Sequence, residues 1–128
     1  NERVRAAAAA TLGIMGAPAH RATEMLDMAL KDENEWVRRN AAEALGNIGV
    51  RAEKAIPALM AALEDRRPVT RWSLSEDGFR ENVMMALLKI IPDEKRDAFP
   101  VFKTLDQDPS EYIRSWARQM VAGVGGIY

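Results

Sequence analysis

The hydrophobic positions of this chain follow the period of an α-helix. Between residues 37 and 48 they lie at +4, +7, +8 and +11 from the first one, which places them on one face of a helix. They are Val37, Ala41, Ala44, Leu45 and Ile48. Between residues 56 and 63 a spacing of +3, +4 and +7 predicts a second amphipathic helix. A linker of about five residues joins the two, which suits an antiparallel helical hairpin.

Glycine and proline mark the ends of these predicted helices. Gly49 follows the last apolar residue of the first helix, where a residue with positive φ commonly ends a helix, and Gly16 has the same place further upstream. Pro57 lies near the beginning of the second helix, where its missing N–H costs little. The pattern places Leu45 and Leu59 in the core between the two helices.

The pattern repeats along the chain. A shift of 33 residues aligns residues 4 to 32 with residues 37 to 65, and 13 of these 29 positions are identical. A third copy begins at Val83 and a partial fourth copy begins at Ile113. We therefore predict one all-α repeat domain over 1–128, with repeat starts near 4, 37, 83 and 113 and about seven helices.

Alanine recurs at matching positions of the copies. Ala41 and Ala42 in the second copy correspond to Ala8 and Ala9 in the first, and the fourth copy contributes Ala117. Helix propensity favours alanine, but propensity does not explain why the same positions recur. We interpret the small side chains as a means of bringing neighbouring helices close together.

The stretch VRRNAAEALGNIG and the later AEKAIPALMAALED resemble the HEAT repeat, in the short bacterial form also seen in phycobilin lyases. The resemblance covers nearly the whole chain and implies a right-handed α-solenoid of antiparallel helical hairpins whose inner helices line a concave binding surface. It also implies that Arg5, Arg38 and Arg114 match the family's arginine, which often pairs with an acidic residue of an adjacent repeat. The third copy has Met84 there, so its junction should pack differently.

Composition narrows the classes of function. The 18 basic and 19 acidic residues leave a net charge of −1, so nucleic acid is not an expected partner. The longest apolar run is well short of the roughly 20 residues that a membrane helix needs, so no membrane partner is expected either. Cysteine is absent, which leaves the compartment open. Because the chain begins at Asn1 with an inner helix, we expect it to be a piece of a longer chain.

The sequence offers no constellation for catalysis, which needs a nucleophile, a base and an orienting group together. The one histidine, His20, could be a lone acid, base or metal ligand, but is better explained as an exposed residue of an interhelical turn. The acidic pairs at 76–77 and 93–94 fall where helices should begin, where the helix dipole favours carboxylates. The glycines at 123–126 lack the features of a phosphate loop. We expect no enzyme, cofactor or metal.

The candidate binding residues are those positions of the inner helices that point away from the hairpin core. A purely solvated face would be polar throughout, whereas this face mixes polar with large apolar and aromatic side chains, which suits a protein or peptide partner. The alternative is that Ile14 or Trp116 packs against a neighbouring repeat. The candidates are Ile14, Arg39, Asn40, Glu43, Met85, Lys89, Trp116 and Gln119.

An insertion at 66–80 lengthens the step between the second and third copies from 33 to 46 residues. It contains Arg71, Trp72 and Phe79, and tryptophan and arginine are the residue types that dominate interface hot spots. We expect the third inner helix to begin near Glu76. The rest of the insertion either folds back as a lid over the ridge between the second and third repeats or binds a partner.

Two classes of function remain open. The first is a non-catalytic interaction or scaffold module that binds a protein or peptide on its concave face, and the sequence favours this class. The second, implied by the resemblance, is a bilin-lyase-like or chaperone-like subunit, or an accessory repeat domain of a larger enzyme. Neither the partner nor the oligomeric state can be deduced from the residues.

Overall fold

The computed structural model describes residues 4, 5, 7–9, 11, 19–65, 78–92 and 105–125, which form helices joined by turns. These ranges contain no strand and five α-helices with defined bounds, which confirms the all-α prediction. The chain divides into two compact units, Asn1–Ile90 and Ile91–Tyr128. The single repeat domain, the seven helices and the right-handed superhelix stay predictions.

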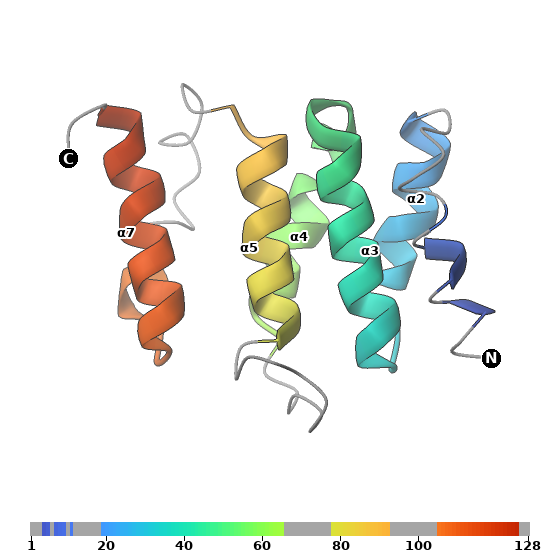
Figure 1. Cartoon of the computed structure of the whole chain (residues 1–128), viewed down its shortest axis with the longest axis horizontal. Coiled ribbons are helices and arrows are strands. Elements are labelled where there is room, and N and C mark those ends of the chain that lie inside the picture. The colour runs from blue at the N-terminus through green and yellow to red at the C-terminus, as the bar shows by residue number, and fades with distance from the viewer. Residues whose placement is uncertain are drawn as a thin grey trace. The chain divides into compact units, whose positions relative to one another are not determined.

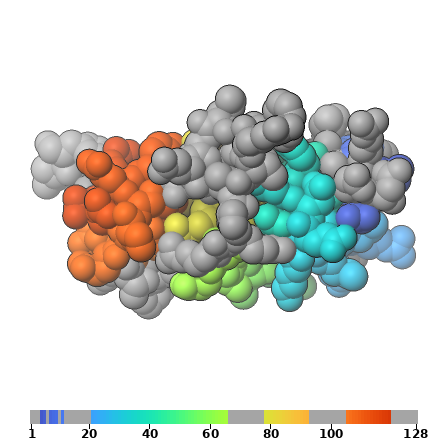
Figure 2. Space-filling view, turned by 90° about the horizontal axis from the view of Figure 1, so that it is seen from below, coloured from blue at the N-terminus to red at the C-terminus, as the bar shows by residue number. Residues whose placement is uncertain are grey.

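The first unit is built of two layers of helices. In Figure 1 the helices α3 and α5 lie side by side and run in the same direction, with α2 and α4 behind them. Figure 2 shows the side chains of α2 and α3, in blue and cyan, lying against one another. The bounds are α2 Ala19–Ala29, α3 Glu35–Ile48, α4 Ile56–Ala62 and α5 Gly78–Ile90.

Local sequence explains where α3 begins and ends. The side chain of Asn34 accepts hydrogen bonds from the backbone N–H groups of Trp36 (2.9 Å) and Val37 (3.3 Å), which satisfies donors that have no partner within the helix. At the other end Gly49 has a φ of 75°, and its N–H donates to the carbonyl oxygen of Leu45. Glycine adopts this conformation without strain, so the predicted end at Gly49 is confirmed.

The linker between α3 and α4 is itself helical. Residues Gly49–Ala55 form the 3-10 helix η1, which is kinked at Ala52, where φ is −93° and ψ is 20°. Helix α4 then begins at Ile56, with Pro57 in its first turn as predicted. The hairpin therefore contains less irregular backbone than the sequence suggested.

The predicted helical faces form the core of the first unit. Leu45 and Leu59 are fully buried, as are the recurring alanines Ala41 and Ala42. Gly46 lies at a close contact between α3 and α5, because a Cβ added there would lie 3.1 Å from the Cα of Ala86. The recurring alanines are buried, and their role in bringing neighbouring helices close stays a prediction.

The second unit contains the 3-10 helix η3 (Leu105–Gln107) and α7 (Glu111–Gly125). Its helix begins as α3 does, because Ser110 Oγ accepts a hydrogen bond from the N–H of Ile113 at 3.3 Å. In both places an aspartate side chain accepts the N–H of the capping residue, Asp32 from Asn34 and Asp108 from Ser110. This shared entry supports a repeat start near residue 113.

Two arginine–aspartate pairs recur in the first unit at the same separation in sequence. Arg5 Nε lies 2.6 Å from Asp32 Oδ2, and Arg38 Nε lies 3.5 Å from Asp65 Oδ2. The resemblance implied an acidic partner in an adjacent repeat. In both pairs the aspartate instead ends the copy that its own arginine begins, while the charge of Arg38 also helps to lower the pKa of Asp32, which lies in the preceding copy.

What Arg38 binds in the preceding repeat is backbone. Its Nη1 donates to the carbonyl oxygens of Asp32 at 2.8 Å and Glu33 at 3.0 Å. Arg114 makes the same two bonds to the residues just before Ser110, at 2.7 and 3.0 Å. The guanidinium thus connects the first turn of an inner helix, through hydrogen bonds, to the loop that precedes the helix. This contact explains why arginine recurs at the second position of the copies.

The third copy is packed differently, as its Met84 predicted. Met84 is fully buried, and the arginine function moves one helical turn earlier to Arg80, whose Nε donates to the carbonyl oxygen of Leu63 at 2.7 Å. The ring of Phe79 lies 5.4 Å from the guanidinium of Arg38. Phe79 and Arg80 are therefore core residues, and the interpretation of Phe79 as part of a partner-binding insertion is wrong.

Asp32 and Asp27 should respond in opposite ways to the same substitution. The hydrogen bond from Arg5, with that from the Asn34 N–H, holds the pKa of Asp32 below its ordinary 3.8. Burial raises the pKa of Asp27, opposed by Lys31, and its Oδ1 is buried without a hydrogen-bond partner. At pH 7 the Asp32 charge therefore stabilises the fold and the Asp27 charge destabilises it.

We expect Asp32→Asn to lower the midpoint of urea unfolding at pH 7 and Asp27→Asn to raise it. The Asp32 contribution is present above its ordinary pKa and is lost as the pH falls through the lower folded value, so the deficit of Asp32→Asn should shrink in acid. The gain from Asp27→Asn should also shrink there, because the buried carboxyl becomes neutral. Changes of the same sign at pH 7 would contradict the assignment. The Asp32 effect should not exceed about 1 kcal/mol, because its partner is exposed.

Candidate functional site

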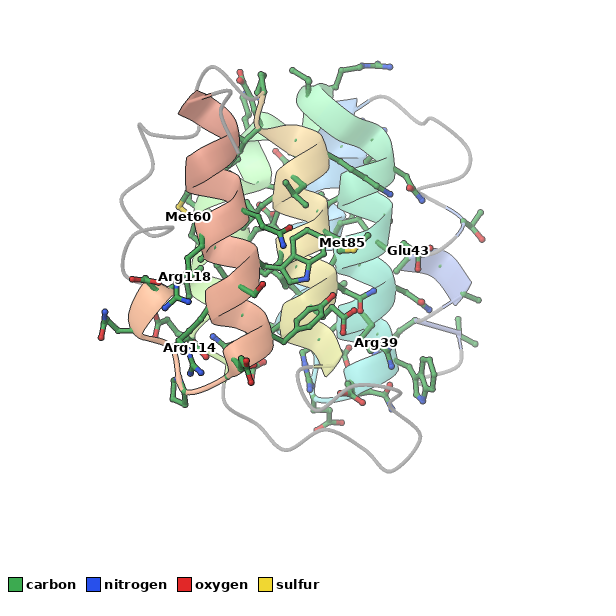
Figure 3. The ribbon with its side chains drawn as sticks, turned by 60° about the vertical axis from the view of Figure 1, so that its left-hand side comes forward. Arg39, Glu43, Met60, Met85, Arg114 and Arg118 are labelled. Atoms are coloured by element: carbon green, nitrogen blue, oxygen red, sulfur yellow. The ribbon has the colours of Figure 1, made fainter. Side chains whose placement is uncertain are left out.

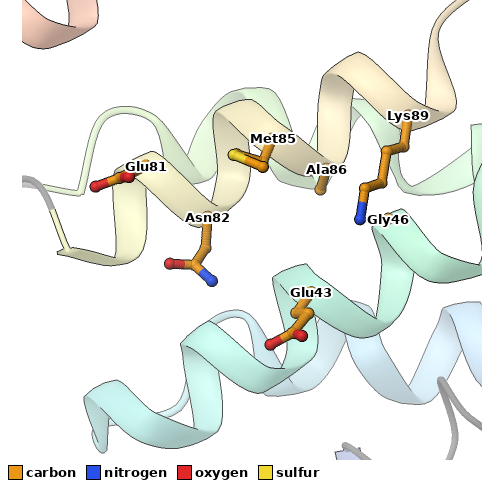
Figure 4. Close-up of a pocket in the computed structure, with 7 residues that line it drawn as sticks. All are labelled: Glu43, Gly46, Glu81, Asn82, Met85, Ala86 and Lys89. Carbon is orange, nitrogen blue, oxygen red and sulfur yellow. The ribbon is translucent and has the colours of Figure 1, made fainter.

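A groove lies between α3 and α5 on the side of the layer that faces away from the outer helices (Figure 4). Its volume is about 250 Å³. Both helices contribute, α5 more than α3. The lining residues are Glu43, Gly46, Glu81, Asn82, Met85, Ala86 and Lys89.

The groove exists because small and long side chains alternate at the contact between the two helices. Gly46 and Ala86 touch at its floor and let the helix axes come close. The α5 residues at positions 82, 85, 86 and 89 share one helical face. Asn82, Met85 and Lys89 have longer side chains than Ala86 and form one wall of the groove. Glu43, one turn before Gly46 on α3, forms the opposite wall.

The lining combines the thioether of Met85 with charged and amide side chains. Glu81 lies near one end of the groove and Lys89 near the other, with Met85 between them (Figure 4). Met85 leaves 41% of its surface exposed, which is high for a large apolar residue. Lys89 Nζ donates to Asn47 Oδ1 at 3.4 Å, which ties it to α3. This mixture is typical of surfaces that bind polypeptide.

Three of the predicted binding residues come together here. Glu43, Met85 and Lys89 line the groove from two helices. Arg39 and Asn40 are half-buried neighbours on α3, and the guanidinium of Arg39 lies 5.0 Å from the ring of Trp36 (Figure 3). The binding role of all five stays a prediction.

Two groove residues, Glu81 and Asn82, were missed from the sequence. The third copy was aligned from Val83, so positions 81 and 82, which precede that start, were not compared with the inner-helix positions of the other copies. The available signal was spacing, because Glu81 and Asn82 precede Met85 by four and three residues and so share its face.

The other predicted residues lie outside this groove. Trp116 and Gln119 belong to α7 of the second unit, where the ring of Trp116 is 5.9 Å from that of Tyr112 and Gln119 is exposed. A concave face shared by all four copies therefore stays a prediction. Three candidates are outside the described residues: Ile14, Arg71 and Trp72.

The described residues offer no grouping of ligands for a metal. Within them, no three histidine or acidic side chains are close enough to hold an ion. His20 is the second residue of α2, so its placement in an interhelical turn was wrong. In the same ranges, no helix has the length and apolar character needed to cross a bilayer.

Comparison with known families gives one match. A family model described as HEAT repeats matches residues 1–76, which include the first two copies. HEAT repeats generally mediate protein–protein interaction or scaffolding. The match does not distinguish the phycobilin-lyase form from other HEAT repeats. No curated protein is significantly similar to the chain.

Proposed function

The chain belongs to the HEAT-repeat family, and from this we propose that it is a non-catalytic module that holds a protein or peptide segment along the inner helices α3 and α5. The observation that carries the proposal is the groove between these helices. It combines a polar rim, an exposed thioether and a floor of closely packed backbone. Three of the predicted binding residues line it, namely Glu43, Met85 and Lys89.

The geometry supports recognition of an extended segment. Met85 offers an apolar contact in the middle, and methionine adapts to side chains of different shape. The carboxylates of Glu43 and Glu81 and the ammonium of Lys89 offer charged contacts that would fix the direction of a bound segment. The floor is rigid because Gly46 and Ala86 are in contact, so little ordering is needed on binding.

The proposal assigns no reaction to the chain. Its single histidine and lack of cysteine leave few options for a nucleophile and base. Nucleic acid is not part of the proposal, because a net charge of −1 gives no excess of basic residues for phosphate contacts.

The test uses a peptide selected from a random library on the purified protein. We expect Met85→Glu to weaken binding of that peptide at least about tenfold in titration calorimetry, because the change replaces the exposed apolar side chain of the groove with a charged one. The matched control is Val50→Glu in η1, since Val50 is 56% exposed and lies outside the groove.

Both variants should keep the wild-type melting temperature within a few degrees, because both replaced side chains are exposed. A peptide that binds Met85→Glu as tightly as the wild type would show that the groove is not the binding site. Equal weakening by Val50→Glu would also refute the proposal.

A further inference from the structure

A second cavity, more apolar than the groove, lies beside the Arg5–Asp32 pair. Its volume is about 350 Å³. One wall is the helical stretch that contains Ala8 and Ala9, the other is α2, and Val37 of α3 lines it as well. Two methionines at its edge, Met25 and Met28, are 57% and 77% exposed.

Because the chain is a repeat, the second copy contains residues equivalent to those that line this cavity. The shift of 33 residues that relates the Arg5–Asp32 pair to the Arg38–Asp65 pair also relates Leu26 to Leu59. Ala8 and Ala9 of the cavity become Ala41 and Ala42 in the same way. Although the side chains correspond, the two arginines differ, because 42% of the Arg5 side chain is exposed and only 4% of the Arg38 side chain.

An aromatic ring covers the arginine in the second copy. The Phe79 ring lies 5.4 Å from the Arg38 guanidinium and is buried. Phe79 precedes Val83 by four residues, and Val83 is the counterpart of Val37. The residue four before Val37 is Glu33, which is exposed and precedes the first turn of α3. The extra helical turn at the beginning of α5 thus supplies an aromatic ring to Arg38. The equivalent position before α3 is Glu33, which has no ring to offer to Arg5.

We propose that the cavity beside Arg5 accepts an aromatic side chain from another protein, with the ring against the guanidinium as Phe79 lies against Arg38. Arg38 keeps its aspartate while contacting the ring, so the Arg5–Asp32 pair is compatible with such a ligand. An aromatic face attracts a guanidinium, and the thioethers of Met25 and Met28 make favourable contacts with ring edges. This site is separate from the groove and does not depend on it.

The probe is N-acetyl-phenylalanine methylamide, with N-acetyl-leucine methylamide as the matched aliphatic control. Binding is followed by NMR of the protein labelled at its methionine methyl groups. We expect a saturable ring-current shift of the Met25 and Met28 signals, with no shift at Met60 or Met85, which lie outside the cavity. The leucine probe should cause little change.

Two variants test the assignment. Arg5→Met keeps the length of the side chain but removes the charge, and should weaken the phenylalanine probe about three- to fivefold. Ala8→Leu should block it by filling the cavity, while unchanged Met60 and Met85 signals show that the fold is kept. Equal binding of the two probes, no shift at Met25 and Met28, or full affinity in Arg5→Met would each overturn the proposal.

Discussion

Replacement of Leu45 or Leu59 by alanine is expected to destabilise the first unit by about 2–5 kcal/mol. Both leucines are fully buried, one on α3 and the other on α4, at the centre of the predicted hairpin. The surroundings are rich in alanine and glycine at close helix contacts, and such contacts have little freedom to move into a new cavity. The loss of stability should therefore include most of the free energy of leaving an unfilled cavity, in addition to the lost burial of the side chain.

The measurement is urea unfolding followed by far-ultraviolet circular dichroism, with Val50→Ala as the control. Val50 is an exposed aliphatic residue of η1, so its truncation should cost no more than about 0.5 kcal/mol. If Leu45→Ala and Val50→Ala unfolded at the same midpoint, the assignment of the core face of α3 would be wrong.

The helices were predictable because a buried face imposes a period on the sequence. The apolar spacing of α3 and α4 follows from packing one side of each helix on its neighbour, and Gly49 ends α3 because few other residues tolerate a φ of 75°. Both signals are local. The cap by Asn34 was equally local, but it was missed because the repeat was aligned from Val37 onward.

The packing of the third copy could not be read from the sequence for a different reason. Arginine is a residue type that is usually exposed, and the burial of Arg80 and Phe79 involves an acceptor and a cation from distant parts of the chain. Leu63 provides the carbonyl oxygen for one, and Arg38 provides the guanidinium for the other. Periodicity shows which face of a helix is buried, but it does not show which polar group of another element contacts a side chain on that face.

The candidate site was predicted in part for a related reason. Repeat alignment gave Glu43, Met85 and Lys89, because equivalent positions of successive inner helices lie on the same side of a stack. The alignment did not include the extra turn of α5, so Glu81 and Asn82 were lost. The cavity beside Arg5 was not foreseen, since it depends on a difference between two copies that the alignment treats as equivalent.

Arg38→Met is expected to destabilise the first unit by about 3–5 kcal/mol, the cost of leaving one member of a buried ion pair without the other. Methionine fills much of the same space, so the loss comes from four contacts of the guanidinium. Asp65 loses its nearby cation, the carbonyl oxygens of Asp32 and Glu33 lose their donor, and the ring of Phe79 loses the guanidinium.

The matched control for Arg38→Met is Arg5→Met, because the shift of 33 residues makes the two arginines equivalent. Both pair with an aspartate, but Arg38 is more deeply buried and also contacts two loop carbonyl oxygens and the ring of Phe79. The exposed pair of Arg5 is worth no more than about 1 kcal/mol. The difference between the two variants in urea unfolding therefore measures what the loop carbonyl oxygens, the ring of Phe79 and the deeper burial together add to an arginine–aspartate pair. If both cost the same, the ring and the loop carbonyls contribute nothing beyond the ion pair, and the junction is held by the apolar residues alone.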